Sequence, residues 1–220
     1  FSSSASIYGN STKEIVDENS LIMPISPYAF TKASIENILT NLYNSNPNFW
    51  KFLSLRYFNP VGAHNSGLIG ENPNGDPTNL FPIMGQVALG LKQKLNVFGK
   101  DWDTFDGTCI RDYIHVMDLA NAHCESIEYL ENNQPAIKFL NIGTGIGTSV
   151  LEAINCFIKV NNIDLKYQFT KRRNGDVGVL IADNKLGLNE LNWAPKENLE
   201  SMCRDAWRYQ KNNLKLKRKS

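Results

Sequence analysis

The sequence has little of what would assign it to a class at once. Only four of its 220 residues are cysteines, and they lie far apart without a C-x-x-C pair, so no disulfide framework is expected. The three histidines are not spaced with them as metal ligands, so no metal centre is expected either. These absences predict reduced thiols in a cytoplasmic protein.

No hydrophobic run is long enough to span a membrane, and the formal net charge is only +1. Neither a membrane nor a nucleic acid is therefore expected as a partner. Residues 211–220 hold five Lys or Arg, which we interpret as a solvated, frayed basic tail. With 42% hydrophobic and 20% charged residues, the composition is typical of a soluble globular protein of one or two domains.

The N-terminal region also lacks the G-x-G-x-x-G fingerprint of a dinucleotide site. The glycines Gly143, Gly145 and Gly147 come late and with a different spacing, so we interpret them as a strand-to-helix turn rather than as a phosphate site. The chain begins at Phe1, inside a predicted strand. We therefore expect a fragment, with a dinucleotide-binding half of about a hundred residues upstream.

The stretch S-P-Y-A-F-T-K, residues 26–32, predicts the start of a helix that continues to about residue 43. Pro27 suits the first turn, where a missing N–H has no partner anyway, and Ser26 suits the N-cap. The 3.6-residue period predicts one face packed on a sheet. That face would hold Phe30, Ile35, Ile38, Leu39 and Leu42.

Tyr28 and Lys32 lie one turn apart on this helix and therefore share a face. An ammonium beside a phenol favours the phenolate, which makes Tyr28 a candidate base at neutral pH. The pattern Y-x-x-x-K is also common on ordinary surface helices, so it needs support from other parts of the chain.

Hydrophobic periodicity predicts further elements along the chain. Strands are expected at 52–58, 95–99, 111–116, 137–141 and 165–169, and helices at 79–91, 119–130, 150–160 and 198–213. Asp118 suits the N-cap of the second of these helices, and residues 170–182 read as an exposed stretch. Ligands of open α/β sheets bind beyond the carboxyl ends of strands, so Phe58 and Asn59 are candidates for a site.

These elements predict an α/β fold, with a partial doubly wound, Rossmann-like parallel sheet and a smaller α/β substrate-binding lobe. Residues 1–60, with 106–136 returning to them, are assigned to the C-terminal part of an NAD-binding domain. Residues 61–105 and 137–210 are assigned to the substrate-binding lobe, and 211–220 to the tail.

The strand end F-S-S-S-A-S-I-Y-G, residues 1–9, followed some two dozen residues later by Y-x-x-x-K, resembles the catalytic triad of extended short-chain dehydrogenases/reductases. The resemblance implies that the Ser4 hydroxyl binds the reacting oxygen and that Tyr28 is the acid/base. It also implies that Lys32 tunes Tyr28 and holds the nicotinamide ribose of NAD.

Further motifs, in one order, resemble the UDP-glucose (UDP-galactose) 4-epimerases through nearly all 220 residues, as the C-terminal two-thirds of such an enzyme. They are L-R-Y-F-N-P-V-G-A-H-N-S, N-L, L-N-V-F-G, D-G-T-C-I-R-D-Y-I-H-V-M-D, N-I-G-T-G and R-R-N-G-D. This family interconverts UDP-glucose and UDP-galactose. It oxidises C4 with bound NAD, lets the 4-keto sugar rotate, and reduces it on the other face.

The resemblance implies roles for particular residues. Phe58 would lie beside the nicotinamide, so Ser4, Tyr28, Lys32 and Phe58 form the cofactor set. The substrate set is Asn59, Asn79, Leu80, Asn96, Val97, Phe98, Arg111, Arg173, Asp176 and Leu180. The two arginines and the helix start at Asn79–Leu80 would hold the diphosphate, the strand around Phe98 the uracil, and Asp176 the ribose. Leu180 takes the position that limits the C2 substituent of the sugar, so weak activity on N-acetylated sugars is expected.

Two alternatives stay open. One is another extended short-chain enzyme of sugar nucleotides, such as a uronate epimerase, a dehydratase or a decarboxylase. A dehydratase would need an acidic pair beside the catalytic serine, which Ser4-Ala5-Ser6 does not provide. The other is a non-catalytic fragment, because most contacts to NAD would be missing. The full-length protein is expected to form a homodimer.

Overall fold

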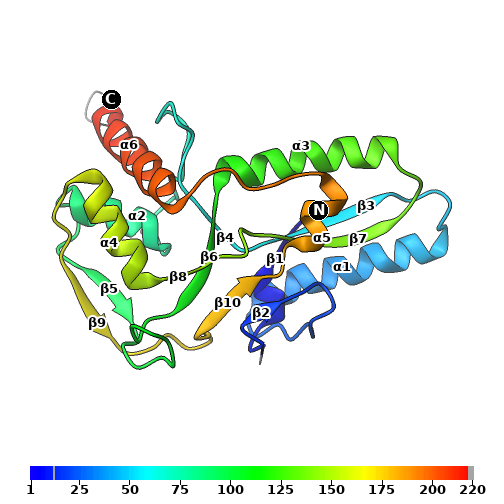
Figure 1. Ribbon diagram of the computed structural model, residues 1–220, viewed down its shortest axis with the longest axis horizontal. Helices are drawn as coiled ribbons and strands as arrows, with labels where there is room; N and C mark the ends of the chain where they lie inside the picture. Colours follow the sequence, from blue (N-terminus) through cyan, green and yellow to red (C-terminus); the bar gives the residue numbers. More distant parts are fainter. Residues whose placement is uncertain (12, 218–220) are drawn as a thin grey trace.

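The computed structural model describes residues 1–11 and 13–217 as two lobes joined by a central sheet (Figure 1). The first lobe holds a parallel sheet in the order β1-β3-β7. Its strands are β1 Ser2–Ser4, β3 Phe52–Tyr57 and β7 Ile137–Ile142, and the 3-10 helix η1 Ala5–Tyr8 follows β1 directly. The long helices α1 Pro27–Ser45 and α3 Val116–Asn132 lie on either side of this sheet (Figure 1).

The central sheet runs in the order β2-β10-β6-β4, with β8 antiparallel to β6. Its strands are β2 Ile15–Val16, β4 Asn59–Val61, β6 Ile110–His115, β8 Gly147–Ser149 and β10 Val179–Ala182. The second lobe is built on the parallel pair β5 Leu95–Phe98 and β9 Tyr167–Thr170, with α2 Leu80–Ala88, α4 Val150–Asn161 and α6 Leu199–Lys217. The short helix α5 Lys185–Leu191 packs on α3 and β7. The predicted α/β class, with a parallel Rossmann-like sheet and a second α/β lobe, is confirmed.

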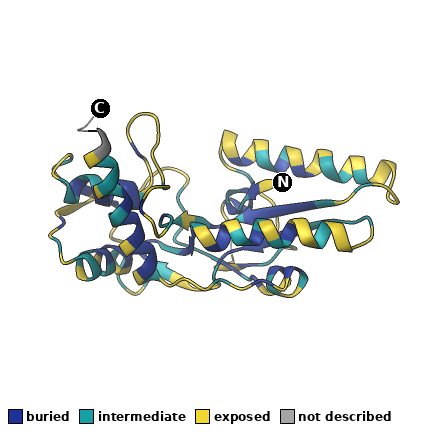
Figure 2. Cartoon of the chain, turned by 90° about the horizontal axis from the view of Figure 1, so that it is seen from above, coloured by how far each residue is buried: buried dark blue, intermediate teal, exposed yellow. Residues whose placement is uncertain are grey.

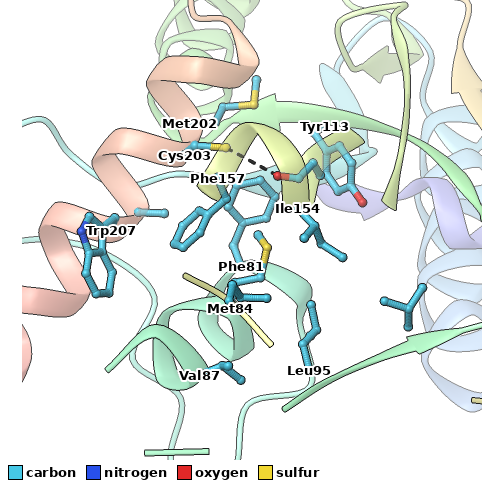
Figure 3. Packing of buried hydrophobic residues seen from close by; sticks show 14 residues of the cluster. Phe81, Met84, Val87, Leu95, Tyr113, Ile154, Phe157, Met202, Cys203 and Trp207 are labelled. Carbon is cyan, nitrogen blue, oxygen red and sulfur yellow. Dashed lines mark hydrogen bonds between the residues drawn. The ribbon is translucent and has the colours of Figure 1, made fainter. Parts of the chain in front are cut away.

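Aromatic side chains form the centre of the second lobe's core (Figure 3). Phe157 of α4 is fully buried and stands edge-on to Phe81 and Trp207, with ring centroids 6.3 and 6.1 Å away. Edge-to-face contacts of this kind add to the free energy gained by burying the rings. The inward face of α6 completes this core. Buried in or packed against this core are Leu199, Met202, Cys203, Ala206 and Trp207.

Helix α1 begins as the sequence predicts. The Ser26 hydroxyl accepts a hydrogen bond from the backbone N–H of Ala29 at 3.2 Å, and Pro27 occupies the first position of the helix. A capped N-terminus satisfies one of the N–H groups that have no partner inside the helix.

The predicted inward face of α1 is wrong. The buried residues of the helix are Ala29, Ala33 and Glu36, whereas Phe30 is 64% exposed. Two small side chains let the helix approach the sheet closely, and Glu36 is buried because it meets a cation there. The larger apolar side chains consequently face outward, and Figure 2 shows exposed residues along the long helices beside a buried strand. Exposed on α1 are Phe30, Ile35, Ile38 and Leu42.

The start of α3 also differs from the prediction. The helix begins at Val116, and its N-cap is His115, whose Nδ1 accepts a hydrogen bond from the N–H of Met117 at 3.0 Å. Asp118 lies in the first turn, and its carboxylate accepts the N–H of Glu197 instead. Because a histidine at the end of β6 supplies the cap, the strand runs into the helix without a loop.

Several short elements were not predicted. The strand β10 lies inside residues 170–182, which the sequence presented as an exposed stretch, and β2, β8 and α5 were missed as well. Elements of two to seven residues show too little periodicity to be recognised, and their neighbours stabilise them. The prediction of a frayed tail is wrong for residues 211–217, which belong to α6. The remainder of that tail, 218–220, lies outside the described residues.

The glycine-rich turn after β7 binds a carboxylate of the protein itself. The N–H groups of Thr144 and Gly145 donate to the Asp112 carboxylate at 2.8 and 2.9 Å, and the Thr144 hydroxyl donates at 2.7 Å. At Gly143 a Cβ would stand 2.6 Å from an Asp112 oxygen, so only glycine fits there. Donors that could cradle a phosphate are therefore already occupied, in agreement with the interpretation as a structural turn.

The division into domains drawn from the sequence stays a prediction. Strand pairing places β7 next to β3, and α5 packs with α3, so residues 137–142 and 185–191 lie in the first lobe.

None of the helices among residues 1–11 and 13–217 is long and apolar enough to cross a membrane. Within the same residues, no group of three or more His, Cys, Asp or Glu is placed to bind a metal ion.

Candidate active site

A pocket of about 250 Å³ lies between the central sheet and the second lobe. The strand β4, which follows β3 directly, forms one wall, and further walls come from the N-terminus of α2, the strands β5 and β6 and the segment 173–176. Nine of the residues predicted to bind substrate line it. They are Asn59, Asn79, Leu80, Asn96, Val97, Phe98, Arg111, Arg173 and Asp176.

The two arginines approach the pocket from different elements. Arg111 projects from β6, where its guanidinium donates to the carbonyl of Ile110 at 2.9 Å and lies 3.9 Å from the Asp176 carboxylate. Arg173 comes from the loop before β10, and its guanidinium carbon lies 3.8 Å from the ring centroid of Phe98. The cations retain N–H groups for an anionic ligand, because neither side chain is fully committed to a carboxylate.

The N-terminus of α2 adds a third positive element to the pocket. Asn79 is the N-cap residue but makes no side-chain capping hydrogen bond, because its amide donates to Glu71 at 2.7 Å. Thr78, Asn79 and Leu80 nevertheless line the pocket. First-turn N–H groups and the positive end of the helix dipole therefore face the same space as the arginines, which suits a phosphate group.

The residues of β5 line one side of the pocket. Val97 is buried in the core, and the Asn96 side chain accepts a hydrogen bond from Gln168 of β9 at 2.9 Å. Phe98 is half-buried and presents a ring face, which the guanidinium of Arg173 covers.

Eight residues that line the pocket were missed by the sequence reading, and two of them, Cys109 and Tyr113, lie close to Arg111. Cys109 lies two residues before Arg111 and Tyr113 two residues after it. In an extended chain such residues point to the same side, and all three line the pocket. Burial raises the pKa of the Cys109 thiol and of the Tyr113 phenol, so both side chains are neutral donors at neutral pH. The spacing of two residues on either side of Arg111 would have identified both from the sequence.

The three residues of the predicted catalytic triad lie outside this pocket, at the end of β1 and the start of α1. The Ser4 hydroxyl is the N-cap of η1 and accepts hydrogen bonds from the backbone and the hydroxyl of Ser6, at 3.2 and 2.9 Å. The ammonium of Lys32 lies 5.5 Å from the ring centroid of Tyr28 and donates to the carbonyl of Ser2 at 2.7 Å. Tyr28 itself is 56% exposed.

Phe58 and Leu180 lie in a separate hydrophobic cluster. Phe58 is only 6% exposed, and its N–H donates to the carbonyl of Ile142 at 3.1 Å. Leu180 of β10 is partly buried and packs against the same cluster. Neither residue lines the pocket of the two arginines, although Asn59 follows Phe58 directly into its wall.

The residues of the predicted cofactor set have the right chemistry for the nicotinamide end of NAD. An ammonium, a phenol and a hydroxyl lie at the carboxyl end of the parallel sheet, where open α/β sheets bind their ligands. Lys32 and Tyr28 are accessible, so both can reach ribose and substrate hydroxyls. Lys32, Tyr28 and Ser4 are therefore the groups of this chain that fit such a cofactor.

Comparisons with known proteins identify the family of the chain. A protein-family model described as GDP-mannose 4,6 dehydratase matches residues 1–206. The UDP-glucose 4-epimerase of Bacillus subtilis (strain 168) is 46% identical over 214 residues, which are 97% of this chain and 62% of that protein.

Two solved structures are similar over almost the whole chain. The UDP-glucose-4-epimerase from Stenotrophomonas maltophila, with bound NAD and formylated UDP-arabinopyranose, has a TM-score of 0.95 at 44% identity, over 98% of this chain and 64% of that one. The UDP-glucose 4-epimerase from Bifidobacterium longum, in complex with NAD+ and UDP, has a TM-score of 0.91 at 39% identity, over 97% and 63%.

The chain thus spans somewhat less than two-thirds of the length of the relatives that it matches. The resemblance to the UDP-glucose 4-epimerases is confirmed. Because the family model covers residues 1–206, this chain belongs to the family described as GDP-mannose 4,6 dehydratase, among the extended short-chain dehydrogenases/reductases.

Proposed function

We propose that the protein to which this chain belongs interconverts UDP-glucose and UDP-galactose with the help of NAD. The observation that carries the proposal is the pocket in which Arg111, Arg173 and the N-terminus of α2 converge. Three positive elements around one space suit a diphosphate. The similar epimerases crystallised with NAD and with UDP or a UDP-sugar support the same assignment.

The second lobe would hold the nucleotide. On binding, Arg173 would turn from the ring of Phe98 toward the diphosphate, and the uncovered ring face would then be free to stack on the uracil. The backbone of β5 would hydrogen-bond the uracil edge, and Asp176 would accept the ribose hydroxyls. Asn59, at the pocket wall nearest Phe58, would donate to the sugar nucleotide.

The first lobe would carry out the chemistry at the sugar. Ser4 would hydrogen-bond the 4-oxygen, and the Tyr28 phenolate oxygen would accept the proton of the 4-hydroxyl and later return it. Lys32, whose ammonium lies beside the Tyr28 ring, would favour the phenolate. Bound NAD would supply a reversible hydride acceptor for C4, next to Phe58.

The change of configuration requires the sugar to turn while the nucleotide stays fixed. Binding energy is concentrated on the UDP part, where the cations are, so the 4-keto sugar can rotate about its link to the diphosphate. The proton-transfer group then meets the other orientation of the same sugar.

The assay that tests this proposal uses the full-length protein. The purified full-length protein, here the parent, is incubated separately with UDP-glucose and with UDP-galactose. The product hexose is identified in each direction. We expect both reactions to reach the same equilibrium mixture. Conversion of UDP-glucuronate or GDP-mannose without interconversion of the two hexoses would instead assign the protein to another sugar-nucleotide reaction.

Leu180 would set the specificity for the C2 substituent of the sugar. Its branched side chain is packed against the cluster around Phe58, which leaves little freedom to move aside. Activity on UDP-N-acetylglucosamine is therefore expected to be much weaker than on UDP-glucose. Comparable rates on the two substrates would contradict this role.

The full-length protein is proposed to be a homodimer. The outer face of α1 presents large apolar side chains, among them Phe30 and Ile38 at 64% and 56% exposure. A contiguous apolar helix face of this kind is typical of a protein–protein interface. Sedimentation of the parent should give twice the protomer mass, and Phe30→Asp should reduce it to one.

Residues 1–220 alone are proposed to have negligible turnover, because the residues that would hold most of NAD are not among those that surround Tyr28.

The four cysteines are free, which supports a cytoplasmic location for the protein.

A further inference from the structure

A row of buried polar side chains crosses the parallel sheet of the first lobe. Ser3 on β1 is the register partner of Arg56 on β3, which is in turn the partner of Asn141 on β7. Their exposed fractions are 1%, 2% and 0%. Polar groups buried this deeply are costly unless each is hydrogen-bonded, so the row calls for an explanation.

An ion pair stands at the centre of the row. Arg56 donates from Nε and from a terminal nitrogen to the two carboxylate oxygens of Glu36, at 3.0 and 2.8 Å. Glu36, on α1, is 2% exposed and also accepts the hydroxyl of Ser3 at 2.6 Å. The bidentate geometry fixes the direction of both side chains, so the helix and the two strands are held in one arrangement.

The other terminal nitrogen of Arg56 extends the network to η1. It donates to the hydroxyl of Tyr8 at 3.0 Å, and Tyr8 donates to the Asn141 side chain at 2.6 Å. Burial raises the pKa of Tyr8 to about 12, so the phenol keeps its proton for Asn141. Asn141 also donates to the carbonyl of Val16 at 2.9 Å, which satisfies the far end of the row.

The candidate catalytic groups are attached to this ion pair from both sides. Ser4 lies between Ser3, which binds Glu36, and η1, whose last residue Tyr8 binds Arg56. Tyr28 lies on α1 about two turns before Glu36, on the same helix. A shift of Glu36 or of Arg56 would therefore change the distance between the hydroxyl of the serine and the phenol of the tyrosine.

We propose that the Glu36–Arg56 ion pair, with Ser3, is a positioning network that fixes Ser4 relative to Tyr28 for the proposed reaction. The inference deepens the proposed function and rests on it. Neither Glu36 nor Arg56 touches the candidate reacting groups, so both act through Ser3, η1 and α1. A buried ion pair is a weak source of stability compared with apolar packing, whereas it does impose one geometry on three elements.

The test compares two buried serines in the full-length protein. Ser3→Ala removes the hydrogen bond between the catalytic strand and Glu36 but leaves the Glu36–Arg56 pair intact. Ser54→Ala is the matched control, since Ser54 on β3 is fully buried and its hydroxyl has no hydrogen-bond partner. We expect Ser3→Ala to lower kcat about tenfold with KM unchanged, because small misplacements of reacting groups reduce turnover strongly. Ser54→Ala should stay within about twofold of the parent.

A second readout does not depend on turnover. The pH at which the Tyr28 phenolate forms is followed by ultraviolet difference absorbance against Tyr28→Phe. Lys32 on α1 and Tyr57 on β3 face Tyr28, and none of the substitutions alters them. Ser3→Ala should shift that pH, as should the same-sized substitution Glu36→Gln, and Ser54→Ala should not.

The outcomes separate the two proposals. If Ser3→Ala and Ser54→Ala behave alike in kcat and in phenolate formation, the positioning network is refuted. It is also refuted if the loss of kcat in Ser3→Ala is matched by a lower Tm while the phenolate forms at an unchanged pH. If the parent does not interconvert the two hexoses, the proposed function fails, and phenolate formation alone then decides on the network.

Discussion

The pocket in the second lobe and the candidate catalytic end of the first lobe differ in how much of each is built by this chain. The pocket has walls from β4, α2, β5, β6 and the segment 173–176, and its cations already have partners, with Arg111 near Asp176 and Arg173 on Phe98. The catalytic end is open, since Tyr28 is 56% exposed. Its groups lie beside a sheet whose polar side chains Ser3, Arg56 and Asn141 are buried.

This difference separates binding from chemistry. Substrate affinity should depend on the pocket alone, whereas turnover should depend on what covers the catalytic end. Substitutions in one region should therefore change the property of the other much less than its own.

Tyr28→Phe in the full-length protein should reduce kcat by about a thousandfold, because the ring remains but the group that accepts the proton is lost. Binding of UDP, measured by calorimetry, should be unchanged because Tyr28 does not line the pocket. Undiminished interconversion of the hexoses would remove Tyr28 from the mechanism.

Phe157→Ala should destabilise the protein by about 3–5 kcal/mol, because it empties the centre of the second lobe's core. Chemical denaturation measures this loss. Phe105→Ala is the control, since Phe105 is 71% exposed, and it should cost less than about 0.5 kcal/mol. A similar loss for both would contradict the assignment of Phe157 to the centre of this core.

Arg173→Ala should weaken the binding of UDP by about 1.5–3 kcal/mol, the contribution of a hydrogen bond to a charged group, with a smaller effect on kcat. The neighbouring Arg172→Ala is the matched control. Arg172 stacks on Trp102 and bonds to Asp101, and it does not line the pocket of Arg111 and Arg173. Equal losses of UDP affinity for the two variants would contradict the assignment of the diphosphate site.

The ion pair of Glu190 should make the smallest contribution, which is to the free energy of unfolding and is present only above acidic pH. A hydrogen bond from Lys138 lowers the pKa of Glu190, so ionised Glu190 stabilises the folded state above its ordinary pKa. As the pH falls through the lowered pKa this stabilisation is lost. Because both side chains are partly exposed, the difference from Glu190→Gln in the free energy of unfolding should be below about 1 kcal/mol near neutral pH and should vanish at low pH. A difference independent of pH would show that another interaction is responsible.

The sequence predicted the long elements well. The helix at α1 and the strand at β3 follow from local patterns that need no knowledge of distant residues, whereas the pocket residues around Arg111 were implied by the resemblance to the UDP-glucose 4-epimerases. Cys109 and Tyr113 lie two residues on either side of Arg111. This spacing could have identified them as pocket residues, but the prediction did not use it. The short strands β2 and β10 could not be predicted, because they exist only through pairing with segments far away in the chain.

By itself, the sequence determined which residues could do chemistry, since a tyrosine and a lysine one turn apart on a capped helix are a local property. Only the tertiary structure decided which face of α1 is buried, because that depends on Arg56, twenty residues from Glu36, meeting its carboxylate. The register that aligns Ser3, Arg56 and Asn141 likewise joins three distant segments. The alignment of polar side chains across a sheet is set by strand order and register, which no local pattern encodes.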